Sequence, residues 1–376
     1  MTVSAERLRD LTLELVEVPS PTGDTADVAG LYASRLREIG MEVELLDEVF
    51  PQTPTVVGRL RGSGPGPTVV LNGHLDTVPI PHEPARADAE AVHGRGSADM
   101  KGACASALDA VRVFAQTPFH GEVVVVAIGL HEAPDGRGED LKHLLDSGFA
   151  ADYAVVCELG GHEVPVAHMG QATVEIAITR PGMPTHELQT PRGTPHPLHA
   201  AGRVLAAIEE LNARLAQTEH PWVGAETSFV GEVHGGDFYN RFPAACRIVG
   251  TRRWAPGNTL EAVDREYREL LAGVATATGC HIDVDLQLVR GAYEIDDDHP
   301  LLRALQEAYE EVTGKPLEPV GVKVVADGAL FAAAGIPTVY HGPVGSGAHA
   351  DVEFVPVAEL VRAAEVYVAL LRRLLA

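Results

Sequence analysis

Residues 69–80, VVLNGHLDTVPI, and residues 93–106, HGRGSADMKGACAS, set metal-ligand side chains within an apolar strand pattern and a glycine-rich turn. The apolar start of the first stretch predicts a buried strand, and alternation along it places His74 and Asp76 on one face at its end. Asp99 in the second stretch precedes an Ala-rich helix, whose start would hold the carboxylate rigidly. An imidazole and two carboxylates in this setting predict a metal site, although either stretch alone would also suit a structural His or a helix-capping Asp.

The length and charge of the chain limit the classes of function. A chain of 376 residues favours two domains. Its formal net charge of −24 argues against nucleic acid or an anionic membrane as a partner, because phosphate binding depends on clustered Lys and Arg. The four cysteines lack disulfide or zinc-ribbon spacing, and the N-terminal segment resembles an amphipathic helix closed by Pro19. We therefore expect a cytoplasmic protein with reduced thiols and no export or membrane segment.

The order of strand and helix patterns changes twice along the chain. Alternating strands and helices predict an α/β fold before residue 171 and again after Pro300. Between these parts the order is strand, helix, strand, strand, helix, strand, which is typical of a small α+β domain. We predict a discontinuous catalytic domain of residues 1–170 and 289–376, with a central mixed sheet flanked by helices. Residues 171–288 would form an inserted, ferredoxin-like lid and dimerisation domain.

Six segments of the chain resemble motifs of the superfamily of co-catalytic zinc amidohydrolases. This superfamily includes aminoacylases, acetylornithine deacetylase, succinyl-diaminopimelate desuccinylase and glutamate carboxypeptidase. GHLDTVP, GRGSADMKG, CELG and GPVGSGAHADVEFVP are similar to its metal motifs, and GMPTHE and GGDFYNRFP are similar to its lid motifs. The resemblance covers nearly the full chain. It implies the two-domain fold described above.

The resemblance also implies a site for two zinc ions, with Co²⁺ or Mn²⁺ as substitutes. His74 and Glu158 would bind one ion, His349 would bind the second, and Asp99 would bridge them. Asp76 would orient the His74 imidazole. Imidazole and carboxylate ligands suit zinc, and two metals would polarise a carbonyl and lower the pKa of a bridging water. Without the resemblance, Glu158 could equally be a capping acid, and His349 could lie in a surface turn.

The sequence departs from the family pattern after a buried strand. Where the family has two glutamates, a general base and a ligand of the second metal, this chain has His131 and Glu132. Counting from Gly121, which opens the strand, places His131 at the base position and Glu132 at the ligand position. Counting backward from Gly138 instead places Glu132 at the base position and Ala133 at the ligand position. We favour the first count, because loops absorb insertions and buried strands do not.

The role of His131 decides between two functions. A neutral His can act as a general base, since its ordinary pKa is about 6.5, although two nearby dications would lower that value. Alternatively, His131 points outward beside one useful acid. The first function is hydrolysis of an amide bond in an N-acyl amino acid or small peptide-like substrate by a metal-activated water. The alternative is a repurposed, non-hydrolytic protein that binds metal and ligand.

The lid motifs imply roles for residues distant from the metals. In the resembling enzymes the lid forms a homodimer, and His186 matches a His that reaches the partner's site and stabilises the oxyanion. Asn240 and Arg253 are implied to bind the substrate carboxylate, which suits a planar guanidinium. Arg252 is an alternative to Arg253, because consecutive strand residues face opposite ways. Asp327 matches a family segment, but we assign it no chemistry.

Overall fold

The protein divides into two compact units. The computed structural model describes residues 2–132 and 134–376. The main unit consists of Met1–Val166, Ile295–Val320 and Ala326–Ala376, and the inserted unit consists of Ala167–Glu294 and Gly321–Val325. The predicted insert, 171–288, lies inside the inserted unit, but the sequence pattern did not predict that the short segment 321–325 belongs to this unit.

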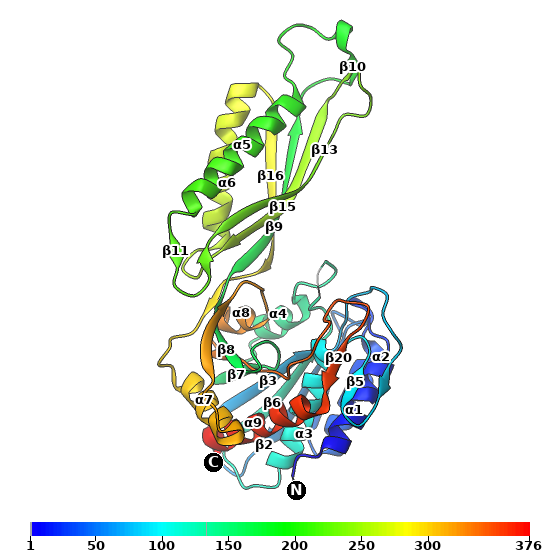
Figure 1. Cartoon of the computed structure of the whole chain (residues 1–376), viewed down its shortest axis with the longest axis vertical. Helices are drawn as coiled ribbons and strands as arrows, with labels where there is room; N and C mark the ends of the chain where they lie inside the picture. The colour runs from blue at the N-terminus through cyan, green and yellow to red at the C-terminus, as the bar shows by residue number, and fades with distance from the viewer. Residues whose placement is uncertain (1, 133) are drawn as a thin grey trace. The chain divides into compact units, whose positions relative to one another are not determined.

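The main unit is built on a six-stranded sheet in the order β1-β2-β6-β3-β7-β19 (Figure 1). β3 is parallel to its neighbours β6 and β7, and β19 is parallel to β7, whereas β2 is antiparallel to both β1 and β6. The predicted central mixed sheet is therefore confirmed. The strands are β1 (Glu42–Leu46), β2 (Thr55–Arg61), β3 (Thr68–His74), β6 (Glu122–Ile128), β7 (Tyr153–Val156) and β19 (Thr338–Tyr340).

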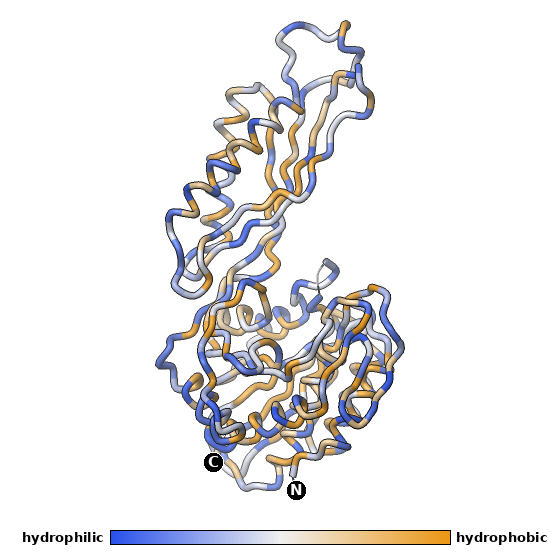
Figure 2. The backbone as a smooth tube through the Cα atoms, in the orientation of Figure 1, coloured by the Kyte–Doolittle hydropathy of each residue, from blue (hydrophilic) through white to orange (hydrophobic). Residues whose placement is uncertain are grey.

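Helices flank this sheet. α9 packs against α1, α3 and α7, and α1 also packs against α3. α2 contacts β1 and β2, and α8 contacts β7 and β19. Small Ala side chains allow α3 to lie close to α9; α3 is almost wholly buried, and most of α9 is buried as well. Figure 2 shows hydrophobic residues concentrated along the strands. The helices are α1 (Ala5–Glu17), α2 (Ala26–Glu38), α3 (Gly102–Phe114), α4 (Glu139–Asp146), α7 (Pro300–Thr313), α8 (Gly328–Ala333) and α9 (Val357–Leu375).

A small second sheet in the main unit joins two segments that are distant in the sequence. It has the order β20-β5-β4, with strands β4 (Arg86–Ala87), β5 (Ala91–His93) and β20 (Phe354–Pro356). β20 pairs antiparallel with β5. The turn that follows β5, which includes the helical segment Ser97–Lys101, is thereby brought beside the loop that precedes β20.

The inserted unit contains a four-stranded antiparallel sheet in the order β13-β15-β9-β16 and two helices. Apolar side chains of the sheet and helices, such as Ile176, Val204 and Tyr267, form its core. The order strand, helix, strand, strand, helix, strand is the one expected from the sequence. The elements are β9 (Gly170–Thr179), α5 (Pro197–Leu215), β13 (Thr227–Gly235), β15 (Ala245–Trp254), α6 (Leu260–Thr278) and β16 (His281–Arg290).

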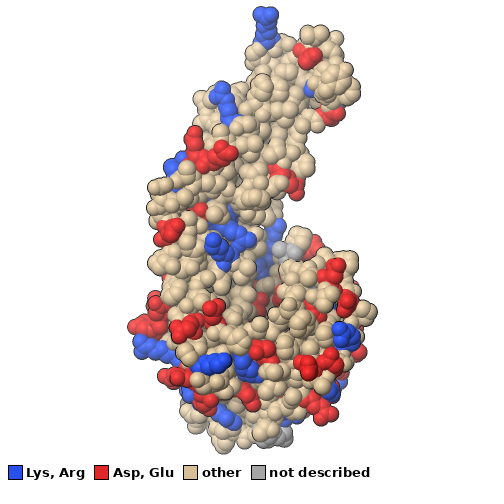
Figure 3. Space-filling view, viewed as in Figure 1, with Lys and Arg blue, Asp and Glu red and all other residues tan. Residues whose placement is uncertain are grey.

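Short elements complete the two units: β8 (Glu163–His168), β10 (Thr185–His186), a turn of 3₁₀ helix (Glu187–Gln189), β11 (Glu219–His220), β12 (Gly224–Ala225), β14 (Arg241–Phe242), β17 (Tyr293–Glu294) and β18 (Glu318–Val322). Within the described residues, no helix is both long and apolar enough to cross a membrane. The sequence has 53 Asp and Glu residues against 29 Lys and Arg, and Figure 3 shows acidic and basic side chains interspersed on the visible face.

Candidate metal centre

All five predicted metal ligands lie together in the main unit. His74 is the last residue of β3, Glu132 follows β6, and Glu158 follows β7. Because these three strands are parallel, their carboxyl ends open at the same edge of the sheet, which is where α/β proteins bind ligands. Asp99, before α3, and His349, before β20, reach the same edge because β20 pairs with β5.

Asp99 lies between two imidazoles. His74 Nε2 is 3.1 Å from Asp99 Oδ1, and His349 Nε2 is 3.4 Å from Asp99 Oδ2. The second imidazole also lies 2.9 Å from Glu132 Oε1. Each oxygen of Asp99 therefore faces a different His, which is the arrangement that a bridging carboxylate requires.

The spacing of these donors suits metal ions. His74, Asp99 and Glu132 each place one ligand atom within 4.8 Å of the others, and so do His74, His131 and Glu158. Ligand atoms about 2.0–2.2 Å from one zinc ion lie at such mutual distances. The set combines imidazole nitrogens with carboxylate oxygens, so its chemistry fits zinc as well as Co²⁺ or Mn²⁺.

One oxygen of Glu158 carries a further indication of a bound cation. Glu158 Oε1 is buried and has no hydrogen-bond partner among the described residues. Desolvation of the carboxyl raises the pKa of Glu158 to about 7, against the lowering effect of His131 and His74. A buried carboxylate oxygen without a partner is costly. A metal ion at this position would supply both the missing partner and the compensating charge.

Asp76 contacts His74 and the segment that carries His131 and Glu132, through both its carboxylate and its backbone carbonyl. Its carboxylate accepts the backbone N–H of Glu132 at 2.9 Å and of His131 at 3.1 and 3.2 Å. His74 Nδ1 lies 2.9 Å from the Asp76 carbonyl oxygen and 3.5 Å from its carboxylate. Burial disfavours the charge, but the hydrogen bond with His74 lowers the pKa of Asp76. Asp76 thus contacts His74 most closely through its backbone, while its carboxylate holds the segment that carries His131 and Glu132.

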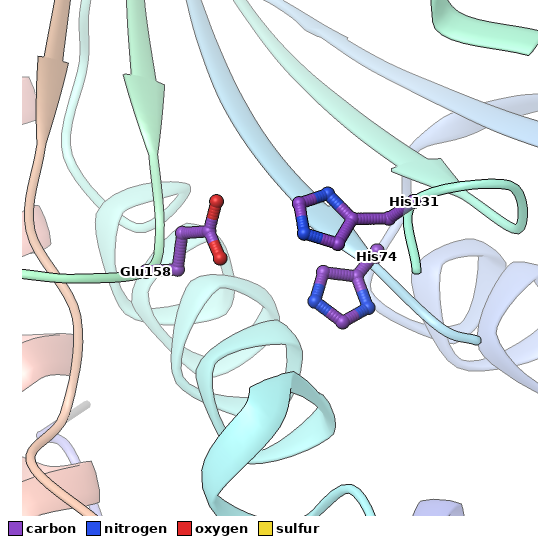
Figure 4. Close-up of side chains that lie close together, drawn as sticks. All are labelled: His74, His131 and Glu158. Atoms are coloured by element: carbon purple, nitrogen blue, oxygen red, sulfur yellow. The ribbon is translucent and has the colours of Figure 1, made fainter. Parts of the chain in front are cut away.

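His131 stacks on His74 at the centre of the site. The ring centroids are 4.1 Å apart and the planes differ by 2°. Figure 4 shows the two rings side by side, facing the Glu158 carboxylate. The His131 side chain is only 13% exposed, so the outward orientation considered from the sequence is not found. Glu132 contacts His349, in agreement with the count from the strand that places Glu132 at the ligand position. Ala133, the ligand in the alternative count, lies outside the described residues.

Asp327 is a neighbour of His131 to which the sequence assigned no chemistry. Its Oδ2 atom lies 2.7 Å from His131 Nδ1, and its side chain is 2% exposed. Burial opposes the charged imidazole, but the Asp327 carboxylate outweighs that effect and raises the pKa of His131 to about 9. The match to a family segment was the one signal for Asp327, and it carried no information about this contact.

Glu353 is a second residue that sequence analysis missed. Its buried carboxylate accepts the backbone N–H groups of Gly96, Ala98 and Asp99 at 2.9, 2.9 and 3.1 Å. It also pairs with Arg95 at 2.6 Å. Glu353 thereby fixes the backbone of the turn that presents Asp99.

The predicted substrate residues lie in the inserted unit. His186, in β10, is exposed, and its Nε2 is 3.2 Å from Asn240 Nδ2. This contact follows from the pairing of β10 with β14, which begins one residue after Asn240. Arg253, in β15, is partly exposed and donates from Nη1 to the Lys323 carbonyl at 2.8 Å.

Arg252 has a different environment from Arg253. Its side chain is 1% exposed and forms ion pairs with Glu226 at 2.6 Å and with Glu266 at 3.0 Å. The guanidinium of Arg252 is therefore buried and already paired within the inserted unit. Of the two consecutive arginines, Arg253 is the one that a ligand can reach.

The fold and the ligand cluster are those of a metal-dependent hydrolase. The profile of peptidase family M20/M25/M40 matches residues 70–373, and the chain belongs to this family. It is 28% identical to succinyl-diaminopimelate desuccinylase of Shewanella pealeana over 97% of each chain. It is 27% identical to N-formyl-4-amino-5-aminomethyl-2-methylpyrimidine deformylase of Halalkalibacterium halodurans, over 95% of this chain and 92% of that protein.

Solved structures agree with this fold. Aminopeptidase PepT from Bacillus cereus is similar with a TM-score of 0.83 and 22% identity over 99% of each chain. The YXEP protein of Bacillus subtilis, described as a dinuclear metal binding peptidase from the M20 family, has a TM-score of 0.76 and 17% identity over 97% of each chain. The predicted superfamily, fold class and enzyme class are thus confirmed. The chain is a metallopeptidase or amidohydrolase that acts on amides, and the non-hydrolytic alternative is not favoured.

Proposed function

We propose that this enzyme uses two zinc ions to hydrolyse the amide bond of an N-acyl amino acid or a small peptide-like substrate. The observation that carries the proposal is the position of Asp99, whose two oxygens face His74 and His349. His74 and Glu158 would hold one ion, and Glu132 and His349 would hold the other. Asp99 would bind both ions. When bound, the ions would polarise the substrate carbonyl and lower the pKa of the nucleophilic water.

His131 is proposed as the proton acceptor rather than as a metal ligand. The lone pair of an imidazole nitrogen lies in the ring plane, and the planes of His74 and His131 are within 2° of parallel. Lone pairs in parallel planes do not converge on one ion. His74 Nε2 faces Asp99, so it is the ligand. His131 Nε2 is then left to take a proton from the water and return it to the leaving nitrogen.

The inserted unit supplies the residues proposed to bind substrate. Arg253 carries a partly exposed guanidinium, which suits a carboxylate, and Asn240 lies beside His186. We propose that Arg253 and Asn240 bind the carboxylate of the substrate. His186 would stabilise the oxyanion in the site of a partner subunit, which requires a homodimer formed through the inserted unit.

The relatives support an amide substrate but differ in what they release. Their names describe removal of succinyl and formyl groups and cleavage of peptides. A panel of N-acetyl, N-formyl and N-succinyl amino acids and dipeptides therefore tests the proposal, with Zn²⁺, Co²⁺ or Mn²⁺ added. We expect two tightly bound ions per chain and turnover of at least one class. Less than one bound ion per chain, with no turnover under any of these conditions, would overturn the proposal.

A further inference from the structure

His131 and Asp327 form a buried pair at the edge of the metal centre. His131 Nδ1 and Asp327 Oδ2 are 2.7 Å apart, and the two side chains are 13% and 2% exposed. A hydrogen bond with an ionised partner is short and strong where water is excluded. The contact joins the segment after β6 to the start of α8, which are 196 residues apart in the sequence.

The main chain at Asp327 is held in place by packing. Asp327 immediately precedes α8, and its carbonyl accepts the N–H of Leu330 at 2.9 Å. The next residue, Gly328, approaches Tyr340 so closely that a Cβ atom there would lie 2.3 Å from the tyrosine oxygen. Tyr340 is fully buried at the end of β19. The carboxylate of Asp327 is therefore presented from a rigid part of the main unit.

The His131 ring is held by contacts of three kinds. Asp327 binds Nδ1, the His74 ring covers one face, and Asp76 accepts the backbone N–H of His131. These contacts fix the plane of the ring and use one of its two nitrogens. Nε2 is the remaining nitrogen, and the ring faces Glu158 across the site (Figure 4).

We propose that Asp327 is a positioning residue for proton transfer by His131. The charge of two bound metal ions would oppose the rise in the pKa of His131 and favour its neutral form. When Nδ1–H donates to Asp327, this neutral ring must carry its lone pair on Nε2. The water O–H bond then breaks as an N–H bond forms at Nε2, and the same proton later moves from Nε2 to the leaving nitrogen. Asp327 keeps its charge throughout and stabilises the intermediate imidazolium. This inference rests on the proposed role of His131 as proton acceptor.

The position of the proton on His131 can be read directly by NMR. In zinc-loaded protein labelled with ¹⁵N-histidine, long-range ¹H–¹⁵N spectra distinguish a protonated from an unprotonated ring nitrogen, and H131Q assigns the signals. We expect protonated Nδ1 and unprotonated Nε2 in the natural protein, and loss of this preference in Asp327→Asn. Protonated Nε2 in the natural protein would overturn the inference, even if no substrate were found.

Kinetics separate positioning from a purely structural role. We expect Asp327→Asn to lower kcat about 10²- to 10⁴-fold, as loss of a general base does, with KM within about threefold and the bound metal unchanged. Asp327→Glu keeps the charge and should retain more activity than Asp327→Asn. It also serves as the second variant if the Asn variant fails to fold. Asp135→Asn, an exposed acid near His131, is the matched control and should leave kcat unchanged.

Two results would reject the positioning role while leaving the proposed function intact. One is an Asp327→Asn enzyme with kcat within about threefold of the natural enzyme. The other is a variant that loses metal in proportion to its activity, which would assign Asp327 to metal retention. If His131→Gln retained full activity, the proposed role of His131 would itself fail, and the kinetic effects of Asp327 would need another cause.

Discussion

His349 Nε2 lies 2.9 Å from Glu132 Oε1, although the two residues are 217 positions apart in the sequence. The same nitrogen lies 3.4 Å from Asp99 Oδ2. We propose that this cluster of one imidazole and two carboxylates holds the second metal ion, and Glu132, one of its carboxylates, is the residue next to His131. The contact makes the assignment of Glu132 as a metal ligand open to a simple test.

Replacing Glu132 with Ala should remove one metal ion. The second site would lose a carboxylate and keep His349 and the shared Asp99, so we expect metal content to fall from two ions per chain to one. Hydrolysis should fall at least about 100-fold, because both ions act on the reaction. Metal analysis after gel filtration measures the first effect. Asp135→Ala, an exposed acid three residues later, should keep both ions, and retention of both ions by Glu132→Ala would contradict the assignment.

Replacing His131 with Glu tests whether the His is adapted to its reaction. A glutamate cannot donate a hydrogen bond to Asp327, and it removes the ring that stacks on His74. We expect kcat to fall at least about tenfold, with metal content unchanged, while His281→Glu on an exposed part of β16 serves as the control. A large gain in amide hydrolysis would instead mean that hydrolysis in the natural protein has been lost or redirected.

Metal binding should become tighter as the pH rises. In the metal-free site, the hydrogen bond with Asp99 raises the pKa of His349 to about 9, so this imidazole is protonated at neutral pH. It must lose that proton to bind a metal, and Glu158, with a pKa raised to about 7, must do the same below pH 7. Affinity should therefore rise up to about tenfold per pH unit for each proton released, and level off above about pH 9. Calorimetry in two buffers of different ionisation enthalpy counts the protons, and no release at pH 7 would contradict this mechanism.

The sequence predicted the residues whose positions depend on local structure. His74 ends a buried strand and Glu158 lies two residues after another, so the strand pattern placed both near strand ends. Their shared role as metal ligands was implied by the family resemblance. Glu132 needed one further argument, that a buried strand does not absorb insertions. The strand positions followed from the sequence pattern, whereas the roles of Glu158 and Glu132 also required the comparison with the family motifs.

The supporting contacts could not be predicted in the same way. Glu353 reaches the Asp99 turn because β20 pairs with β5, and Asp327 reaches His131 because α8 packs beside β7 and β19. Neither pairing leaves a local pattern in the sequence. The choice between Arg252 and Arg253 depended on which face of β15 covers the core, and a one-residue shift of the strand would have exchanged them.

Replacing the two consecutive arginines with Ala should change two different properties, the stability of the protein for Arg252 and the KM for Arg253. Arg252→Ala would leave Glu226 and Glu266 without their buried partner, and we expect it to lower the free energy of unfolding by about 3 kcal/mol. Arg253→Ala should leave stability unchanged but raise KM about tenfold or more, since a charged hydrogen bond to the substrate would be lost. Chemical denaturation and steady-state kinetics measure the two effects. An unchanged KM in Arg253→Ala would remove Arg253 from the substrate site.

Glu353 offers a test of how the metal centre is held together. Its carboxylate accepts three backbone N–H groups of the Asp99 turn and pairs with Arg95, so Glu353→Gln would place an amide where four donors converge. We expect metal affinity to fall about 10- to 100-fold, the usual effect of removing a residue that supports a ligand. Competition with a chelating dye measures this directly, and Asp351→Asn, an exposed acid in the same loop, is the control. Unchanged affinity in Glu353→Gln would mean that the turn holds Asp99 without this carboxylate. A loss of metal affinity in the Glu353 variant, but not in the Asp351 variant, would show that metal binding depends on the backbone turn that holds Asp99 as well as on Asp99 itself.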